Sequence, residues 1–401
     1  MKCATLLLSL LLFSATVDGQ TLDVSGYVAL RGINGSGPAS WLEEGNGRLP
    51  AGGDENEGAA VAQLGVTWQP VRWFDVHVSG AARQEPEDAR GTAAGFVEAY
   101  ADLRAVFTRD QIQLRAGQFF LPTSRENRGE LWTSPYSINF SALNSWIGEE
   151  FRPIGVDLEW RHEFGVNALT TGATVFRGND TMGTLLAWRG WTIGNRLTVY
   201  DEVLPLSAES LPRLFPRQQD GTTPFREDLD GKTGFAARAR WSMPERGMIQ
   251  VAHVDNQGDR RLWGDEYSWI TRFSVISAEV GRTDSFTAAA EYLDGDTGMG
   301  FRGSPWVQMD FYAAYLLLSQ KYGRNRWTAR YDQFDNTEKD FSRAENNSED
   351  GRAWTFAWLF DVTAKTRLGL EFTQVTGERV ALGDAPSFDG RNVTVELRYS
   401  F

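Results

Sequence analysis

Charged residues recur at every second position in several stretches of the chain. Asp157, Glu159 and Arg161 follow this spacing, and so do Arg238 and Arg240. Alternate side chains of an extended strand point to the same face, so each set would present its charges on one surface. Acidic and basic groups that face one another across a pore orient polar solutes and filter ions by their electric field, without covalent chemistry. The alternative is that these side chains pair with one another and only hydrate the wall.

The same spacing adds further charged residues to this inward-facing set. They are Glu98, Asp102, Arg104, Arg115, Arg330, Asp332, Glu396 and Arg398. Arg104 and Arg115 lie on the two sides of a predicted hairpin, and like charges that close need acidic neighbours. We expect Asp157 and Glu159, on the next strand, to supply them.

Catalytic motifs are missing from the sequence. The three histidines are His77, His162 and His253, and no Gly-x-Ser-x-Gly or His-Glu-x-x-His pattern occurs. We therefore predict that the chain is not an enzyme and holds no cofactor. A hydrolase that gathers its residues from separate strands is the less favoured alternative.

Two acidic stretches contain the oxygen ligands that calcium prefers. Asp54, Glu55 and Glu57 form one stretch, and Asp294 and Asp296 form the other. Acidic stretches of this kind are more often solvated loops, so we predict no metal site.

The N-terminus has the pattern of a secretory signal peptide. Lys2 precedes an apolar run from Leu6 to Phe13, and small residues follow near Gly19. We predict a signal peptide over residues 1–19 and a single domain over residues 20–401. The one cysteine, Cys3, falls within the predicted signal, which excludes a disulfide framework and a thiol catalyst in the mature chain.

The composition favours a membrane barrel over a soluble domain or a helical membrane protein. Aromatic residues make up 12% of the chain, with 15 Trp and 24 Phe, yet charged residues still make up 23%. Only alternate residues of a transmembrane barrel face lipid, and aromatic side chains gather at its two interfaces. The net charge of -13 argues against nucleic acid as a partner.

Alternating stretches of about ten residues run along the whole chain, joined in turn by short and long connections, as in outer-membrane barrels. We predict an all-β fold, an antiparallel transmembrane β-barrel with short periplasmic turns and long extracellular loops. The strand count depends on two stretches, Thr184–Trp191 and Arg196–Val203. Without them the count is 16, and with both it is 18.

The last stretch, Arg391–Phe401, alternates strictly. Val393, Val395, Leu397, Tyr399 and Phe401 share one face, and polar residues share the other. This ending resembles the C-terminal signal that the barrel-insertion machinery reads, so we assign Tyr399 and Phe401 to assembly. We expect the strand to close the barrel by pairing with Leu22–Arg31, which leaves no free edge in the bilayer.

The segment Phe120–Phe151 is a long and unusually apolar connection. We expect it to fold against the inner wall and narrow the pore, with an outer cap or a subunit contact as the alternative. Its charged residues would then line a constriction: Arg125, Glu126, Arg128, Glu130, Glu149, Glu150 and the adjacent Arg152.

Four stretches carry a family resemblance: Arg115–Pro122, Asn144–Glu150, Gly183–Trp191 and Tyr315–Phe334. They resemble proteobacterial outer-membrane porins related to the phosphate-selective porin family. The resemblance implies a 16-stranded pore, often trimeric, with an infolded third loop. Phosphate-selective members carry a basic ladder with several lysines, whereas the lysines after the predicted signal are Lys232, Lys321, Lys339 and Lys365.

These observations predict an outer-membrane porin of a Gram-negative bacterium for passive diffusion of small hydrophilic solutes, anionic or zwitterionic, with a preference for anions such as phosphate. Its expected partners are these solutes, outer-membrane lipid and the insertion machinery, with a homotrimer as one assembly state. The alternative is a substrate-specific channel for sugars or aromatic compounds, with Trp132, Tyr136 and Trp146 as stacking platforms. An adhesin or structural barrel is less favoured than either.

Overall fold

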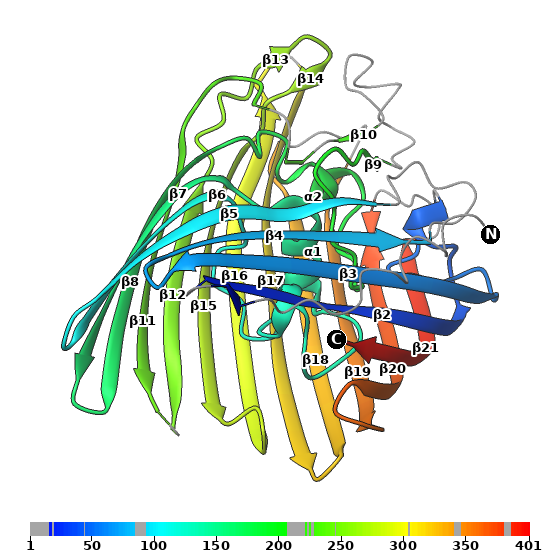
Figure 1. Ribbon diagram of the computed structural model, residues 1–401. Coiled ribbons are helices and arrows are strands. Elements are labelled where there is room, and N and C mark those ends of the chain that lie inside the picture. Colours follow the sequence, from blue (N-terminus) through cyan, green and yellow to red (C-terminus); the bar gives the residue numbers. More distant parts are fainter. Residues whose placement is uncertain are drawn as a thin grey trace.

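The chain folds into one closed antiparallel barrel of 16 strands (Figure 1). The computed structural model describes residues 16–17, 20–43, 45–84, 94–206, 221–222, 224–225, 228–244, 246–303, 305–340, 346–380 and 386–401. Most of the predicted signal peptide, residues 1–15 and 18–19, lies outside the described residues.

The wall strands are β2 (Gln20–Ser36), β3 (Asn56–Val71), β4 (Phe74–Arg83), β5 (Ala94–Val106), β6 (Asp110–Gln118), β7 (Ile154–Phe164), β8 (Asn167–Arg177), β11 (Gly234–Met243), β12 (Gly247–Asp255), β15 (Ile270–Gly281), β16 (Phe286–Gly300), β17 (Trp306–Tyr322), β18 (Asn325–Glu338), β19 (Glu349–Asp361), β20 (Thr366–Arg379) and β21 (Ser387–Ser400). Each pairs with its neighbours along the chain. The short elements are β1 (Thr16–Val17), β9 (Leu204–Pro205), β10 (Gly221–Thr222), β13 (Leu262–Trp263), β14 (Glu266–Tyr267), η1 (Trp41–Glu43) and η2 (Glu130–Trp132).

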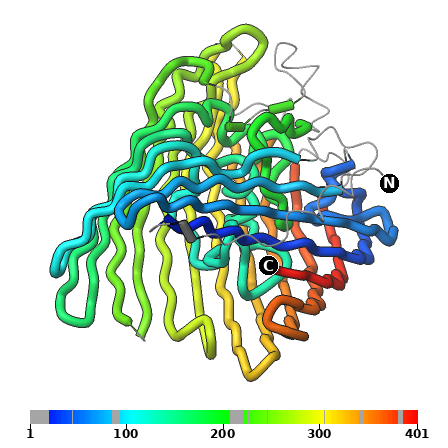
Figure 2. The backbone as a smooth tube through the Cα atoms, viewed as in Figure 1, coloured from blue at the N-terminus to red at the C-terminus, as the bar shows by residue number. Residues whose placement is uncertain are grey.

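The first and last wall strands close the barrel, as the sequence predicted. β2 pairs with β21 in an antiparallel register that places Leu30 opposite Leu397 and Arg31 opposite Glu396. Figure 2 shows the two strands side by side, blue against red. The backbone hydrogen bonds of both edges are therefore satisfied within the barrel, which a membrane wall requires.

The alternation in the sequence corresponds to two different surfaces. On β21 the Leu397 side chain is 46% exposed on the outside, whereas its neighbour Glu396 is fully buried inside. The outer face is apolar and aromatic, and the inner face holds most of the buried charges. The parity argument from the sequence thus assigned the two faces correctly.

The segment Thr184–Trp191 is not a strand. Residues Thr184–Trp188 form the short helix α2, and Gly183 and Gly190 on either side adopt the left-handed conformation, with φ of 95° and 87°. Arg196–Val203 forms no strand either. Helix α2 is buried on all sides, so its sequence shows no alternation of apolar and polar residues. Such an apolar run can be a buried strand or a buried helix, and its periodicity does not distinguish the two. Without these two segments, the wall has 16 strands.

Two helices lie inside the ring of strands (Figure 1). They are α1 (Ala142–Glu150), in the long connection between β6 and β7, and α2, in the connection between β8 and β11. The Ser141 side chain caps α1 by accepting a hydrogen bond from the Asn144 amide. Within the described residues, no helix has both the length and the apolar character needed to cross a membrane.

Candidate functional site

The long connection Phe120–Phe151 folds into the barrel and crosses the lumen. On one side its backbone donates to inward-facing carboxylates, from Ile138 N to Glu371 at 2.6 Å and from Ala142 N to Asp332 at 3.1 Å. On the other side Leu131 packs against β3, where a side-chain carbon added at Gly65 would lie 2.6 Å from Leu131 Cδ2. The predicted infolding is confirmed, and the outer-cap alternative is excluded.

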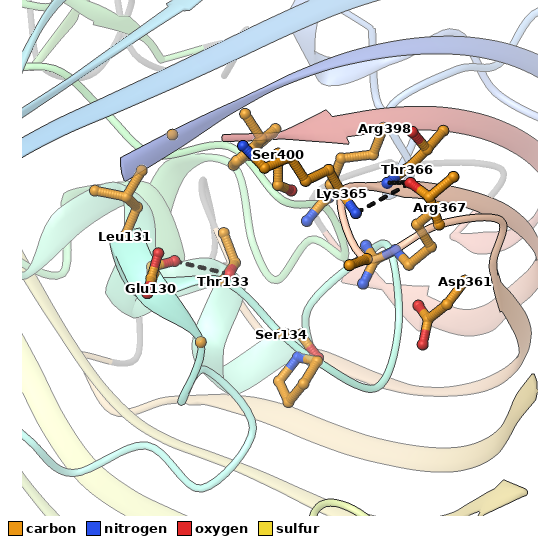
Figure 3. A pocket seen from close by; sticks show the side chains of 16 residues that line it. Glu130, Leu131, Thr133, Ser134, Asp361, Lys365, Thr366, Arg367, Arg398 and Ser400 are labelled. Carbon is orange, nitrogen blue, oxygen red and sulfur yellow. Dashed lines mark hydrogen bonds between the residues drawn. The ribbon is translucent and has the colours of Figure 1, made fainter. Parts of the chain in front are cut away.

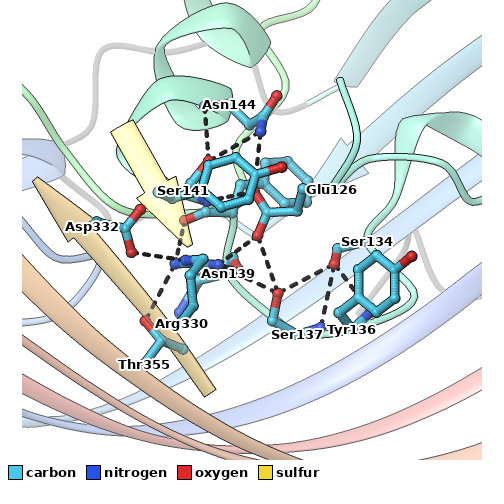
Figure 4. Close-up of polar contacts among 12 residues, drawn as sticks. Glu126, Ser134, Tyr136, Ser137, Asn139, Ser141, Asn144, Arg330, Asp332 and Thr355 are labelled. Atoms are coloured by element: carbon cyan, nitrogen blue, oxygen red, sulfur yellow. Dashed lines mark hydrogen bonds and ion pairs between the residues drawn. The ribbon is translucent and has the colours of Figure 1, made fainter. Parts of the chain in front are cut away.

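Arg330 on β18 anchors this connection (Figure 4). Its guanidinium donates to Glu126 at 2.5 Å, to Asp332 at 2.8 Å and to the carbonyl oxygen of Phe140 at 2.8 Å. The side chains of Arg330, Glu126 and Asp332 are all fully buried. Arg330 and Glu126, which the sequence placed in a pore lining, therefore hold the loop to the wall.

Glu149, Glu150 and Arg152 connect the two infolded segments to each other. Glu150 is fully buried and accepts hydrogen bonds from the Trp146 indole and from the backbone N–H of Gly183 and Leu185 at the start of α2. Glu149 pairs with Arg189 at 2.6 Å. Arg152 lies between the rings of Phe120 and Phe225 and donates to three carbonyl oxygens.

Other charges of the same connection are spread over the lumen. Arg125 is buried and donates to the carbonyl oxygen of Pro122. Arg128 reaches Glu279 on β15. Glu130 is exposed and borders a cavity that is described below.

Arg104 and Arg115 form their ion pairs with carboxylates other than the predicted Asp157 and Glu159. Arg104 pairs with Asp75 on β4, and Arg115 pairs with Asp102 at 2.8 Å. The register explains this, because Arg115 lies opposite Asp102 across the β5–β6 hairpin. Asp157 does lie directly opposite Arg115 in the β6–β7 register, as predicted, but its carboxylate pairs with Arg238, and Glu159 lies opposite Gln113.

Asp157 and Glu159 instead hold an arginine from a more distant strand. Both accept from Arg238 on β11, at 2.6 and 2.8 Å. Arg161 lies 3.6 Å from Glu163, and Arg240 is half-buried on the inner face. The charges along this part of the wall largely neutralise one another.

The aromatic side chains proposed as stacking platforms are not accessible to a solute. Trp146 is buried against Trp191, Phe273 and Phe311, and Tyr136 is fully buried. Trp132 stacks on Phe120, with ring centroids 4.1 Å apart. The faces of these rings are covered by other side chains of the protein. The rings therefore hold the infolded segments in place and offer no surface on which a solute could stack.

Among the described residues, two of the cavities in the lumen lie beside β2. The larger, about 290 Å³, opens at the short-turn end and is bordered by Glu130, Asp361, Lys365, Arg367 and Arg398 (Figure 3). We call it the lower cavity. The smaller, about 100 Å³, lies toward the long-loop end, and we call it the upper cavity. Its charged lining residues are Arg31, Arg83, Glu149 and Arg196.

A cluster of three arginines around one carboxylate separates the two cavities. Glu396 accepts from Arg31 at 2.9 Å and from Arg367 at 3.3 Å, and it pairs with Arg398 at 3.0 Å. Arg31 lines the upper cavity, whereas Arg367 and Arg398 line the lower one. Arg31 also donates to Asn195 at 2.9 Å. Three positive charges against one negative charge leave the cluster, which we call the seam cluster, with an excess of two positive charges.

Sequence reasoning found only half of the seam cluster. Parity identified Glu396 and Arg398, but Arg31 and Arg367 were missed. Arg31 lies directly opposite Glu396 in the β2–β21 register, so the predicted closure of the barrel contained the signal that could have found it.

One acidic group in the described residues was also missed. Carboxylate oxygens of Asp180, Asp228 and Asp230 lie within 4.8 Å of one another. Burial, with Asp230 close by, raises the pKa of Asp180 to about 6. Of the two stretches considered for calcium, Asp294 and Asp296 belong to β16, where Asp296 pairs with Arg272.

Solved structures share this fold at low sequence identity. The DcaP channel of Acinetobacter baumannii is 12% identical, with a TM-score of 0.58 over 96% of this chain and 99% of that chain. OmpF of Salmonella typhi, in a complex with daunomycin, is 10% identical, with a TM-score of 0.57 over 96% and 98%. OmpT of Vibrio cholerae in a trimer form is 9% identical, with a TM-score of 0.54 over 96% and 100%.

No family model matches the chain, and no curated protein matches it in sequence. The chain shares the closed antiparallel β-barrel fold of these outer-membrane proteins. The more specific resemblance to phosphate-selective porins stays a prediction.

Proposed function

We propose that the chain forms a narrow channel in the outer membrane of a Gram-negative bacterium, through which small hydrophilic solutes diffuse passively with a preference for anions. A closed barrel with an apolar outer face suits a lipid bilayer. Its inner face carries arginines, carboxylates and hydroxyl groups, which suit hydrated solutes. The two infolded segments leave limited open space, so the channel is narrow.

The seam cluster is the observation that carries the anion preference. Its excess of two positive charges lies between the lower and upper cavities, so a solute that passes from one to the other meets this field. Charge at a narrow point in a pore sets ion preference with little contribution from tight binding. Guanidinium groups also match the geometry of carboxylate and phosphate, so both classes of anion fit.

Reversal potentials in planar bilayers under a potassium chloride gradient test this proposal. We expect the wild-type channel to prefer chloride, and Arg367→Gln to reduce that preference because it halves the excess charge of the seam cluster. Arg391→Gln is the matched control, since Arg391 is an exposed outer-face residue that pairs only weakly with Asp389. Purified folded barrels without conductance steps would contradict a channel, and cation preference in the wild type would contradict the selectivity.

A substrate-specific channel is the second candidate function. The filling of the lumen by residues 119–152 and 178–206 favours it, because a general diffusion pore needs a wider path. Current block by one solute class at low concentration would support this candidate, and equal passage of all small solutes would oppose it.

We also propose that the barrel assembles as a homotrimer. The trimer form of the Vibrio cholerae barrel, which has the same fold, supports this assembly. Light scattering of the detergent-solubilised protein measures the state directly, and a monomer mass would overturn the proposal.

A further inference from the structure

The lower cavity is lined by hydroxyl groups and by charges of both signs. Its hydroxyl-bearing residues, tyrosine aside, are Thr133, Ser134, Thr363, Thr366 and Ser400. The space of about 290 Å³ is close to the lower end of the range of about 300–1,000 Å³ that small-molecule sites occupy. A ligand that fills this cavity must therefore be small and rich in hydrogen-bonding groups.

Lys365 supplies a positive charge to the cavity that is not held in an ion pair. It lies in the turn between β19 and β20, and its side chain is exposed. Among the described residues, its ammonium group has neither an ion pair nor a hydrogen bond. Arg367 and Arg398 line the same side of the cavity and add the excess positive charge of the seam cluster (Figure 3). This side can therefore hold an anionic group at Lys365.

Glu130 supplies a carboxylate on the other side of the cavity (Figure 3). The residue is exposed, and the hydrogen bonds that Thr133 donates to it go to its backbone carbonyl oxygen. Within the part of the chain that the structure describes, the Glu130 carboxylate has no donor. Asp361, which also lines the cavity, is already paired with Lys321 at 3.0 Å. Glu130 is thus available to accept hydrogen bonds from a ligand.

Three hydroxyl groups on the Lys365 side are open to a ligand. The Thr363 oxygen accepts from the backbone N–H groups of Lys365 and Thr366, at 3.1 and 3.0 Å, so its own hydrogen stays available to donate. The hydroxyl groups of Thr366 and Ser400 have no hydrogen-bond partner in the described ranges. Because a hydroxyl group both donates and accepts, this set matches a ligand that carries several hydroxyl groups of its own.

Simpler ligands use only part of this arrangement. A neutral sugar leaves the Lys365 ammonium group without a counter-ion. A compact inorganic anion reaches Lys365 but has no donor for Glu130, whose negative charge repels it. A carboxylate that carries several hydroxyl groups satisfies Lys365, Glu130 and the hydroxyl groups of the wall together.

We propose that the lower cavity binds a monosaccharide acid, of which a hexuronate is the simplest example. Its carboxylate pairs with Lys365, and its hydroxyl groups donate to Glu130 and exchange hydrogen bonds with Thr363, Thr366 and Ser400. This assignment rests on the proposed channel function, because it makes the cavity a binding station on the solute path. It narrows the transported class from small anions in general to acidic sugars.

Isothermal titration calorimetry on the folded, detergent-solubilised barrel tests the assignment with D-glucuronate. The comparison ligands are D-glucose, which lacks the carboxylate, and cyclohexanecarboxylate, which lacks the hydroxyl groups. We expect D-glucuronate to bind at least fivefold more tightly than either. Equal binding of cyclohexanecarboxylate would reduce the site to a plain anion site and overturn the proposal, as would the absence of D-glucuronate binding.

Charge variants test the roles of the two free charges. Lys365→Gln should weaken D-glucuronate binding at least fivefold and leave D-glucose binding unchanged, whereas Lys365→Arg should restore most of the affinity. The matched control is Lys339→Gln, which removes the same charge outside the cavity and should change nothing. Glu130→Gln should weaken D-glucuronate and D-glucose alike, because it acts on the hydroxyl groups that both ligands share. Unchanged D-glucuronate binding in Lys365→Gln would overturn the proposal.

A filling variant tests the location independently of charge. Ala364 lines the cavity at an exposed turn, so Ala364→Phe occupies part of the space without touching an ion pair. It should weaken D-glucuronate binding at least fivefold. The control is Ala105→Phe, which places the same ring at an exposed position outside the cavity. Full affinity in Ala364→Phe would overturn the location.

These measurements separate the two proposals. A barrel that conducts anions but does not bind D-glucuronate overturns the acidic-sugar site and leaves the channel intact. A barrel that binds D-glucuronate but gives no conductance steps overturns the channel and leaves the binding site intact.

Discussion

Two parts of the inner wall carry the same kinds of side chain in different proportions. On β4 to β11, ion pairs join three arginines (Arg104, Arg115 and Arg238) to four carboxylates (Asp75, Asp102, Asp157 and Glu159). At the β20–β21–β2 seam, three arginines share the single carboxylate of Glu396. We call these the balanced wall and the seam. In both parts the register places an acid beside an arginine, with Asp102 opposite Arg115 and Asp361 opposite Arg367, so an arginine's contribution to the pore's field depends on how many arginines share each carboxylate.

The largest expected effect comes from removing the shared carboxylate. Glu396→Gln leaves the buried Arg31 and Arg398 without their carboxylate, and removing one partner of a buried pair costs about 3–5 kcal/mol. The same change on the balanced wall, Glu159→Gln, leaves Arg238 paired with Asp157 and should cost less than about 1 kcal/mol. Urea unfolding in lipid vesicles measures both. Equal losses of stability would break the distinction between the two regions.

The second effect concerns ion preference. Arg115→Gln on the balanced wall should shift the reversal potential less than half as far as Arg367→Gln at the seam. The reason is that Arg115 is already neutralised by Asp102 at 2.8 Å. An equal or larger shift for Arg115→Gln would place the selective field on the balanced wall.

Salt concentration sharpens the comparison further. Screening shortens the Debye length from about 10 Å at 0.1 M to about 3 Å at 1 M. The anion preference of the wild type should therefore fall between these concentrations, and it should fall less in Arg367→Gln. A preference that does not change with salt would indicate size exclusion as its origin.

The smallest effect on conduction is expected at the chain end. Phe401 exchanges two backbone hydrogen bonds with Gly26, and its ring fills the space above that glycine. Deletion of Phe401 should lower the amount of folded barrel and leave the conductance of single pores unchanged, because no seam arginine is touched. Tyr322→Ala, at an exposed turn aromatic, is the control for general loss of surface area. Altered single-pore conductance would contradict an assembly role.

Much of the wall could be predicted from the sequence, because period-two alternation is a local property. It identified the inward face of Arg330, Asp332 and Glu396 and the pairing of the first strand with the last. The apolar composition of Phe120–Phe151 identified the infolded segment, because so apolar a connection is not stable when it is exposed to water.

The partners of each charge could not be predicted in the same way. A shift of a strand by two residues keeps every side chain on its face but changes every neighbour. The pairing of Arg238 with Asp157 joins β11 to β7 across an intervening strand, and nothing local specifies it. Helix α2 was missed for a different reason, because its five residues are buried on all sides by the barrel around them.

The position of the seam cluster links selectivity to the completion of the barrel. Arg31 lies on β2, Arg367 on β20, and Glu396 and Arg398 on β21, so the four side chains converge only when the two ends of the sheet meet. A barrel that has not yet closed has no such cluster and no field between its cavities. The ion preference of a single pore would therefore indicate whether β2 and β21 have paired. A folding intermediate with an open seam would conduct anions and cations without preference.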